Sequence, residues 1–168
     1  MAAYPKGIMM SVQAPLEDDQ TRQQANKDLI RKYTRVVFNA HNPERAAEFL
    51  APEATWHGGT LGTVEGRDNI IGLLQGFIGA LPDIDAVEQE MVAVDNTVWV
   101  RFVINATHQG DLLGIPATGR PVQWTAVYVY HLEEGKIVEE WAADDLLAIL
   151  HDIGFVTPPW LAGINQGA

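Results

Sequence analysis

The feature of the sequence that most limits its fold is a change of hydrophobic period at Pro82. Before this residue, apolar side chains recur at three- and four-residue spacing, which is typical of amphipathic helices. After it, apolar and polar residues alternate, which predicts strands. Helices followed by consecutive strands indicate an α+β fold, and we expect a curved antiparallel sheet wrapped around three N-terminal helices.

The first half of the chain predicts three helices and one short strand. Asn42 precedes Pro43 and a helical segment, so we expect Asn42 to cap a short helix with Pro43 at its first position. Glycines end the strand and precede the third helix. The expected elements are a long helix over 18–41, the short helix after Asn42, a strand over 54–57 and a helix from Arg67 to near Pro82.

The second half predicts long strands joined by turns and a short C-terminal helix. Gly154 supplies the end of this helix, and Asp144 or Asp145 its N-cap. The expected elements are strands over 87–94, 97–108, 122–132 and 137–141, with turns at Asp95-Asn96 and over 133–136, and the final helix LLAILHDIG. We expect one domain over residues 18–157, with a flexible leader over 1–17 and a C-terminal tail over 158–168.

The charge balance limits the partners. Lys and Arg total 11 against 22 Asp and Glu, a formal net charge of −11, which repels nucleic acid and anionic membrane surfaces. We therefore expect no nucleic-acid or membrane partner, and no apolar run approaches the roughly 20 residues of a membrane span. The absence of cysteine fits a cytoplasmic protein. The five histidines have no metal-binding spacing, so we expect no metal and no other cofactor.

Three segments carry a resemblance to a known family. They are VEGRDNIIGLL in the third helix, HQGDLLGIPATGRPVQW between strands, and EEGKIVEEWAADDLLAILHDIG at the end. The chain resembles the SnoaL-like polyketide cyclases, within the nuclear-transport-factor-like superfamily, over roughly residues 26–154. The resemblance implies a cone-shaped α+β barrel that encloses a hydrophobic pocket and works without a cofactor.

The same resemblance implies positions for catalytic residues. The founding cyclase uses a His on the penultimate strand and an Asp just after the last strand. Aligned from Gly135, these positions fall on Tyr128 and Ala142, so neither residue is retained. Carboxylates lie close by at Glu140 and Asp144, and either is expected to reach the pocket from a shifted position.

Aromatic residues gather on one face of the expected strand over 122–132. Alternation puts Trp124, Tyr128 and Tyr130 on that face. Each has an apolar body and one polar group, which suits a pocket for a fused-ring ligand, although such residues also fill cores or dimer interfaces. We expect Tyr128 to donate a hydrogen bond to a carbonyl or enolate oxygen. The expected ligand-contacting residues are Trp124, Tyr130, His108, Phe102, Phe38 and Trp56.

Four residues are candidates for proton transfer or for contact with the reacting group. His57 and His108 lie at the ends of expected strands, and imidazole titrates in a suitable range. A His beside a Gly-rich turn is also commonly a surface residue. Asp144 competes with Asp145 for the role of helix cap, and Glu140 faces inward if no bulge intervenes before Trp141.

These observations leave more than one function open. The first hypothesis is a cofactor-independent cyclase, lyase or isomerase that acts on a small hydrophobic carbonyl compound such as a polyketide. The second is a non-catalytic, dimeric binding module of the same fold, and the third is a hydroxylase or epoxide hydrolase that activates a water. We also expect a homodimer through the outer sheet face, where Trp99, Val103, Val127 and Val129 would otherwise be exposed.

Overall fold

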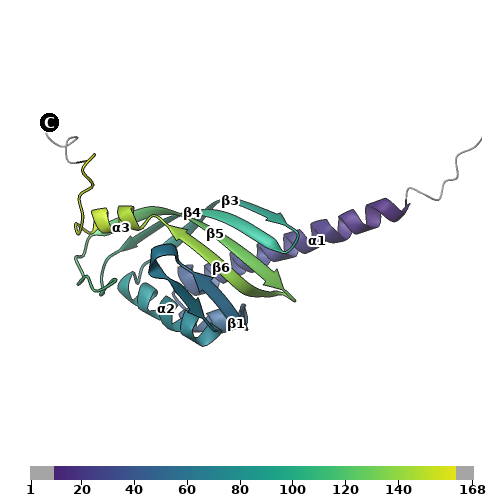
Figure 1. The fold of residues 1–168 in the computed structure, drawn as a ribbon, viewed down its shortest axis with the longest axis horizontal. Coiled ribbons are helices and arrows are strands. Elements are labelled where there is room, and N and C mark those ends of the chain that lie inside the picture. The colour runs from purple at the N-terminus through teal and green to yellow at the C-terminus, as the bar shows by residue number, and fades with distance from the viewer. Residues whose placement is uncertain (1–9, 162–168) are drawn as a thin grey trace, which may run out of the picture.

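The computed structural model describes residues 10–161, with side chains from Asp18 onward, and contains one six-stranded sheet with the order β2-β1-β6-β5-β4-β3. The sheet is curved and unclosed, and helices α1 and α2 lie along one side of it (Figure 1). The expected α+β fold is therefore confirmed. None of the helices in this part of the chain is both long and apolar enough to cross a membrane.

The first half contains the three expected helical segments, with different boundaries. The first helix begins at Met10, not near Asp18, so it includes residues assigned above to a leader, while residues 1–9 lie outside the described part. Asn42 makes no side-chain cap hydrogen bond. The elements are α1 (Met10–Tyr33), a π-helical segment η1 (Thr34–Asn39), a 3₁₀ helix η2 (Pro43–Glu48), β1 (Leu50–His57), η3 (Gly59–Leu61), β2 (Thr63–Glu65) and α2 (Arg67–Ala80).

The second half follows the expected alternation closely. Its elements are β3 (Asp85–Val94), β4 (Thr97–Thr107), β5 (Pro121–Glu133), β6 (Lys136–Asp144) and α3 (Leu146–Asp152). Strands β3 to β6 form three consecutive antiparallel pairs. The β6 strand continues beyond the expected residue 141, and this extension brings Asp144 into the sheet.

One strand pair corrects the expectation of a purely antiparallel sheet. Strand β1 pairs with β6 in parallel, which places Trp56 opposite Glu140, so the sheet is mixed. No hairpin joins these two strands, and without a tight turn nothing forces their directions to oppose. An irregularity between Leu50 and Thr55 shifts the register of this pairing.

The core lies between the concave face of the sheet and the helices. Alternate residues of β4 and β5 are buried there, including Phe102, Trp124 and Tyr128, as period-two alternation predicts. Helix α2 contributes Leu74 and Ile78 to the same core. The face on which the expected pocket aromatics lie is therefore the inner one.

Two adjacent carboxylates at the end of β6 have separate roles. Asp145 accepts a hydrogen bond from the backbone N–H of Ala148 at 3.0 Å and caps α3. Gly154, with a φ of 83°, follows the helix in the left-handed conformation that favours glycine. Because Asp145 caps α3, the side chain of Asp144 does not need to do so and can point into the interior.

Candidate active site

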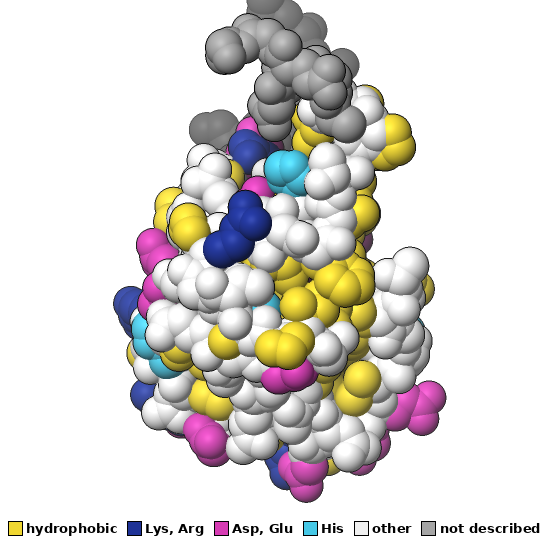
Figure 2. Space-filling view, turned by 90° about the vertical axis from the view of Figure 1, so that its left-hand side faces the viewer, with side chains coloured by type: hydrophobic (Ala, Val, Ile, Leu, Met, Phe, Trp, Pro, Cys, Tyr) yellow, Lys and Arg dark blue, Asp and Glu magenta, His cyan; other side chains and the backbone are white. Residues whose placement is uncertain are grey.

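A hollow with two chambers opens between α2, α3 and the loop that joins β4 to β5. The outer chamber has a volume of about 250 Å³ and the inner one about 50 Å³. Both are lined by Leu61, Leu73, Phe77 and Leu146, so the two chambers adjoin each other. Figure 2 shows hydrophobic side chains gathered at this end of the molecule. The site is thus a deep apolar pocket with a wider entrance.

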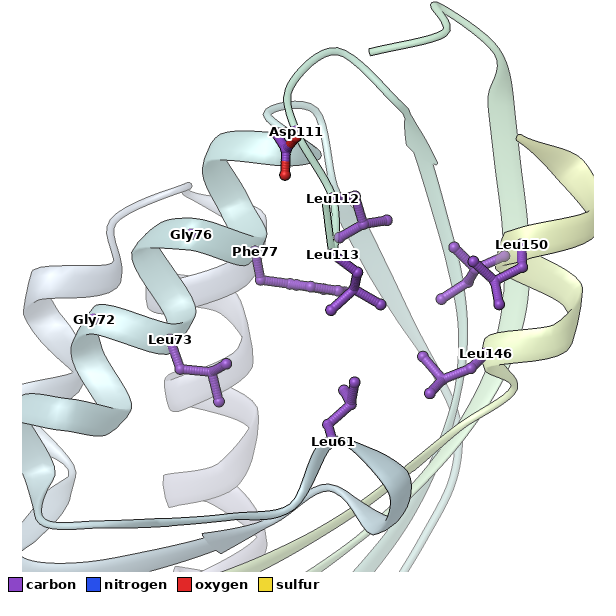
Figure 3. Close-up of a pocket in the computed structure, with 11 residues that line it drawn as sticks. Leu61, Gly72, Leu73, Gly76, Phe77, Asp111, Leu112, Leu113, Leu146 and Leu150 are labelled. Carbon is purple, nitrogen blue, oxygen red and sulfur yellow. The ribbon is translucent and has the colours of Figure 1, made fainter. Parts of the chain in front are cut away.

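Leucines from loops and helix ends form most of the outer chamber. Leu61, Leu113 and Leu150 point toward one another and toward Phe77 across the hollow (Figure 3). Glycines at positions 72 and 76 of α2 leave room there, because a Cβ at either would meet nothing within 4 Å. Sequence reasoning missed these leucines, although apolar residues in the turns GTLG and GDLLG were an available signal.

The inner chamber carries the polar groups of the pocket. Tyr128, Glu140 and Asp144 line it beside an otherwise apolar wall. Among the residues that the structure describes, no Lys, Arg or His lines either chamber. The remaining lining residues of the inner chamber are Phe38, Trp56, Leu61, Leu73, Leu74, Phe77, Ala142 and Leu146.

Asp144 is held by two donors from the neighbouring strand. The indole N–H of Trp124 donates to Oδ1 at 2.7 Å, and the hydroxyl of Tyr128 donates to the same oxygen at 2.9 Å. Burial raises the pKa of Asp144, while these two hydrogen bonds lower it. The net effect is a carboxylate that is more basic than one in water and whose anion is stabilised by two hydrogen bonds.

Glu140 lies deeper and is 3% exposed. Burial, together with repulsion from Asp144, raises its pKa to about 8, although Tyr130 and Tyr33 act in the opposite direction. Neither tyrosine hydroxyl makes a hydrogen bond of ordinary geometry within the described residues, so their interactions with Glu140 are long or poorly aligned. At neutral pH Glu140 is therefore predominantly a neutral acid.

The structure changes the expected role of Tyr128. Its hydroxyl, which we expected to donate to a ligand oxygen, donates instead to Asp144. Burial raises its pKa well above the ordinary value, so the phenol keeps its proton. Tyr128 lines the inner chamber as expected, but its donor capacity is used to hold a carboxylate.

The other expected aromatic residues separate into two groups. Phe38 and Trp56 line the inner chamber. The other three contact lining residues without lining the chamber themselves. Trp124 donates its hydrogen bond to Asp144. The rings of Tyr130 and Phe102 pack against Tyr128, with centroid distances of 6.2 Å for Tyr130 and 5.7 Å for Phe102. The second group supports the pocket without lining it.

His57 does not join this site. Its ring stacks on Trp141, with centroids 4.0 Å apart, and its Nε2 lies 3.0 Å from Oε1 of Glu139. Glu139 and Trp141 alternate with Glu140 and therefore face the other side of the sheet. His57 belongs to the outer face, where it partly covers Trp141.

His108 is buried, with no measurable exposure, just after the end of β4. Its Nδ1 lies 3.0 Å from the hydroxyl oxygen of Thr118, and its Nε2 has no partner within the described residues. It lines neither chamber. The contact between His108 and a ligand stays a prediction that the lining of these two chambers does not support.

The donor set offers no metal site. No group of three or more His, Cys, Asp or Glu side chains within the described residues is arranged to hold a metal ion. The chemistry that the pocket itself provides is that of two carboxyl groups in different protonation states. Such a pair can remove a proton at one position and supply one at another.

Comparison with known proteins identifies the family. The family model described as SnoaL-like polyketide cyclase matches residues 27–153. The chain belongs to this family. Among its relatives, aklanonic acid methyl ester cyclase DnrD of Streptomyces peucetius is 26% identical over 140 residues, which cover 79% of this chain and 91% of that protein.

Solved structures of SnoaL-like proteins share the fold. IdmH of Streptomyces antibioticus, described as a proposed polyketide cyclase, is 30% identical, with a TM-score of 0.66 over 77% of this chain and 98% of its own. A proposed SnoaL-like cyclase of Jannaschia sp. CCS1 is 20% identical, with a TM-score of 0.75 over 81% and 95%. An identity of 20% supports a shared fold and nothing more.

Within the SnoaL-like frame, this chain carries its carboxylates at shifted positions. Tyr128 and Ala142, where the resemblance puts the catalytic His and Asp, are directly opposite each other on β5 and β6. Glu140 and Asp144 flank Ala142 at two-residue spacing and line the same chamber. The pocket thus has a carboxyl group on each side of the expected position.

Proposed function

We propose that this SnoaL-like protein is a cofactor-independent enzyme that moves a proton in a small apolar carbonyl compound, in a cyclisation or isomerisation, with Asp144 as the base. The observation that carries the proposal is the carboxylate of Asp144 in the inner chamber, with Trp124 and Tyr128 both donating to Oδ1. Neither of these hydrogen bonds uses Oδ2, so that oxygen is the one we assign to accept the proton.

The surroundings of Asp144 support this role. Burial makes the carboxylate more basic, and the two donors stabilise its anion and fix its orientation. A binding module needs no titratable group in its cavity, whereas this cavity has two carboxyl groups. The observation favours catalysis over binding alone.

The proposed substrate is apolar over most of its surface and has a carbonyl group at one edge. Leucines and Phe77 of the outer chamber fit the apolar body, and the narrow inner chamber fits the reacting edge. The relative DnrD is named as a cyclase of aklanonic acid methyl ester. That ester is therefore the first natural substrate to assay.

A simple probe tests the proposed base without knowledge of the natural substrate. α-Tetralone is an apolar, fused-ring ketone whose protons beside the carbonyl exchange with deuterium when a base removes them. We expect the protein to bind it and to catalyse this exchange in D₂O, as followed by proton NMR. The Asp144→Asn variant should bind the ketone with similar affinity and lose the exchange, by about 10²-fold or more.

The same experiment can also disprove the proposed function. The Asp145→Asn variant is a neighbouring control, because Asp145 caps α3 and lies outside both chambers. If α-tetralone does not bind, or if Asp144→Asn exchanges its protons as fast as the wild type, the proposed function is wrong.

We also propose that the protein is a homodimer through the outer face of the sheet. Val92, Trp99, Val129 and Trp141 are successive cross-strand neighbours in a row over β3, β4, β5 and β6. Trp99 and Trp141 are each 50% exposed. Arg101 already pairs with Glu90 on this face, and the row itself is apolar, so a second copy could pack on it despite the negative net charge.

A further inference from the structure

Removing a proton beside a carbonyl group creates negative charge on the carbonyl oxygen, and this oxygen needs a donor. The proposed function supplies a base but leaves the donor unassigned. Tyr128 gives its hydrogen bond to Asp144, and Trp124 does the same. No Lys, Arg or His among the described residues lines the chambers. A proton-transfer site of this kind requires a donor aimed at the developing charge.

Glu140 is in the right place to be that donor. It extends from β6 into the inner chamber, opposite Tyr130 on β5 and beside Trp56 on β1. Its strand also carries Asp144, and the two side chains share a wall of the same chamber. A carbonyl compound small enough to reach Asp144 in this space also approaches Glu140.

The groups around Glu140 favour its neutral form. Asp144 on β6 repels the ionised form, and Tyr33 on α1 and Tyr130 on β5 offer only long or misaligned hydrogen bonds. Tyr128, also on β5, is occupied by Asp144. With no cation in the chamber lining, ionised Glu140 would lack the pairing that a buried charge requires. A neutral carboxylic acid has one O–H donor, whereas a carboxylate has none.

The two carboxyl groups therefore have complementary environments. Asp144 receives two well-formed hydrogen bonds that stabilise its anion, whereas the hydroxyls of Tyr33 and Tyr130, which act on Glu140, make no hydrogen bond of ordinary geometry within the described residues. When two neighbouring carboxyl groups have different environments, their pKa values differ, so one site can hold an acid and a base together. We propose that Glu140 is the proton donor to the substrate carbonyl oxygen, while Asp144 is the base. This assignment rests on the proposed function.

The proposed cycle balances without another reactant. Asp144 takes the proton beside the carbonyl, the C–H electron pair forms the enol double bond, and Glu140 gives its proton to the carbonyl oxygen. Asp144 is then neutral and Glu140 ionised. When the enol carbon attacks a second carbonyl carbon, the enol O–H returns its proton to Glu140, and Asp144 protonates the new alkoxide. Both side chains regain their starting states, and one carbon–carbon bond has formed.

Carbon NMR of a bound ketone tests whether Glu140 donates. The probe is α-tetralone labelled with ¹³C at its carbonyl carbon, whose resonance moves downfield when the oxygen accepts a hydrogen bond. In the wild type, at pH values well below 8, we expect the carbonyl resonance to lie downfield of its position in the free ketone. This displacement should disappear as Glu140 ionises near its pKa of about 8. In Glu140→Gln the amide donates at every pH, so the displacement should persist.

Deuterium exchange of the same ketone tests proton delivery. Glutamine keeps a donor but has no proton to transfer, so Glu140→Gln should exchange more slowly than the wild type, by about 10²-fold, the lower end of what a positioned general acid provides. The wild-type rate should fall above about pH 8 as the acid ionises, and this fall should be absent in Glu140→Gln. A merely structural Glu140 would not produce this difference in the pH profiles.

Glu139→Gln is the matched control, because Glu139 is the adjacent residue of β6 and faces the outer side with His57. It should behave as the wild type in both measurements. A carbonyl resonance that does not depend on pH in the wild type, or a high-pH fall in rate that survives in Glu140→Gln, would overturn the role of Glu140. Either result would leave the role of Asp144 intact. The proposed function itself is wrong only if α-tetralone does not bind or if Asp144→Asn exchanges its protons as fast as the wild type.

Discussion

Trp124 donates its indole N–H to Oδ1 of Asp144 over 2.7 Å, from the strand next to the one that carries the carboxylate. Tyr128, four residues later on the same face of β5, donates to the same oxygen. The two aromatic side chains thus fix a carboxylate that a simple alignment with the family would overlook. Their hydrogen bonds determine how basic Asp144 is, and this dependence can be measured.

Removing either donor should make Asp144 protonate at higher pH. In Trp124→Phe or Tyr128→Phe, the anion loses one hydrogen bond, and bonds to charged groups contribute about 1.5–3 kcal/mol, so the pKa should rise by roughly one to two units. The acidic limb of the pH profile for α-tetralone exchange should shift upward by this amount. Activity should recover above the shifted limb. A Tyr128→Phe variant with an unshifted limb would contradict this account.

Glu140 should make the folded protein less stable as pH rises. Its pKa in the fold is about 8, above the 4.5 of an exposed carboxyl group, so the folded state binds more protons than the unfolded state between these values. The stabilisation from neutral Glu140 is complete below pH 4.5 and declines as pH rises through the folded-state pKa. Urea unfolding at a series of pH values should show this decline in the wild type.

Glu140→Gln should flatten that decline, because the amide does not titrate. Asp144, whose pKa is also raised, contributes a decline in the same direction, and this part should remain. Glu139→Gln should keep the wild-type slope. Equal slopes in the wild type and Glu140→Gln would mean that Glu140 is ionised in the folded protein.

Alternation in the sequence was sufficient to predict the antiparallel strands β3 to β6 and the face that carries the pocket. It placed Trp124, Tyr128 and Tyr130 together, and the structure buries all three on the concave side. Local spacing also contained a signal that we did not use for β1. Trp56 and His57 are adjacent in a strand and cannot both face the pocket. With Trp56 inside, His57 had to lie on the outer face, where it stacks on Trp141.

Other features depend on contacts between distant segments. The parallel pairing of β1 with β6 joins residues more than 80 positions apart, such as Trp56 and Glu140, and no local pattern encodes it. The availability of Asp144 depends on Asp145 taking the helix cap, and the sequence left both possibilities open. The leucines of the entrance come from loops whose positions are set by the folded sheet and helices.

The leucine entrance should determine affinity for apolar ligands separately from stability. Leu113 is 58% exposed and has a φ of 55°, a conformation that Asn adopts more readily than Leu. Leu113→Asn should therefore fold normally and bind α-tetralone more weakly, by about fivefold, for a loss of roughly 1 kcal/mol of apolar contact. Leu112 is 4% exposed, and Leu112→Asn should instead destabilise the fold by about 2–5 kcal/mol. Unchanged affinity in Leu113→Asn would exclude it from the binding surface.

The inner chamber should depend on the absence of a side chain at Gly58. A Cβ there would overlap the indole ring of Trp56, while the φ of −111° is accessible to any residue, so close packing alone requires the glycine. Gly58→Ala should displace Trp56 and cost about 1–3 kcal/mol. Gly79→Ala is the control, because a Cβ there meets nothing within 4 Å and an alanine stabilises a helix by about 0.5–1 kcal/mol. Thermal unfolding of both variants gives the comparison, and a fully stable Gly58→Ala would contradict the packing.

The outer face of the sheet should hold two copies of the chain together. Trp99 lies on β4, with Val92 and Val129 as cross-strand neighbours, and half of its surface is exposed in the single chain. Trp99→Glu places a charge where the partner's apolar residues would pack, and each copy would bury one unpaired carboxylate, so the dimer should dissociate at micromolar concentration. Phe155→Glu is the control, since Phe155 is 66% exposed but follows α3 and belongs to none of the strands that carry the row. Sedimentation equilibrium should give a dimer for the wild type and for Phe155→Glu, and a folded monomer for Trp99→Glu. A wild-type monomer at these concentrations, or a Trp99→Glu variant that stays dimeric, would show that this face does not pair with a second copy.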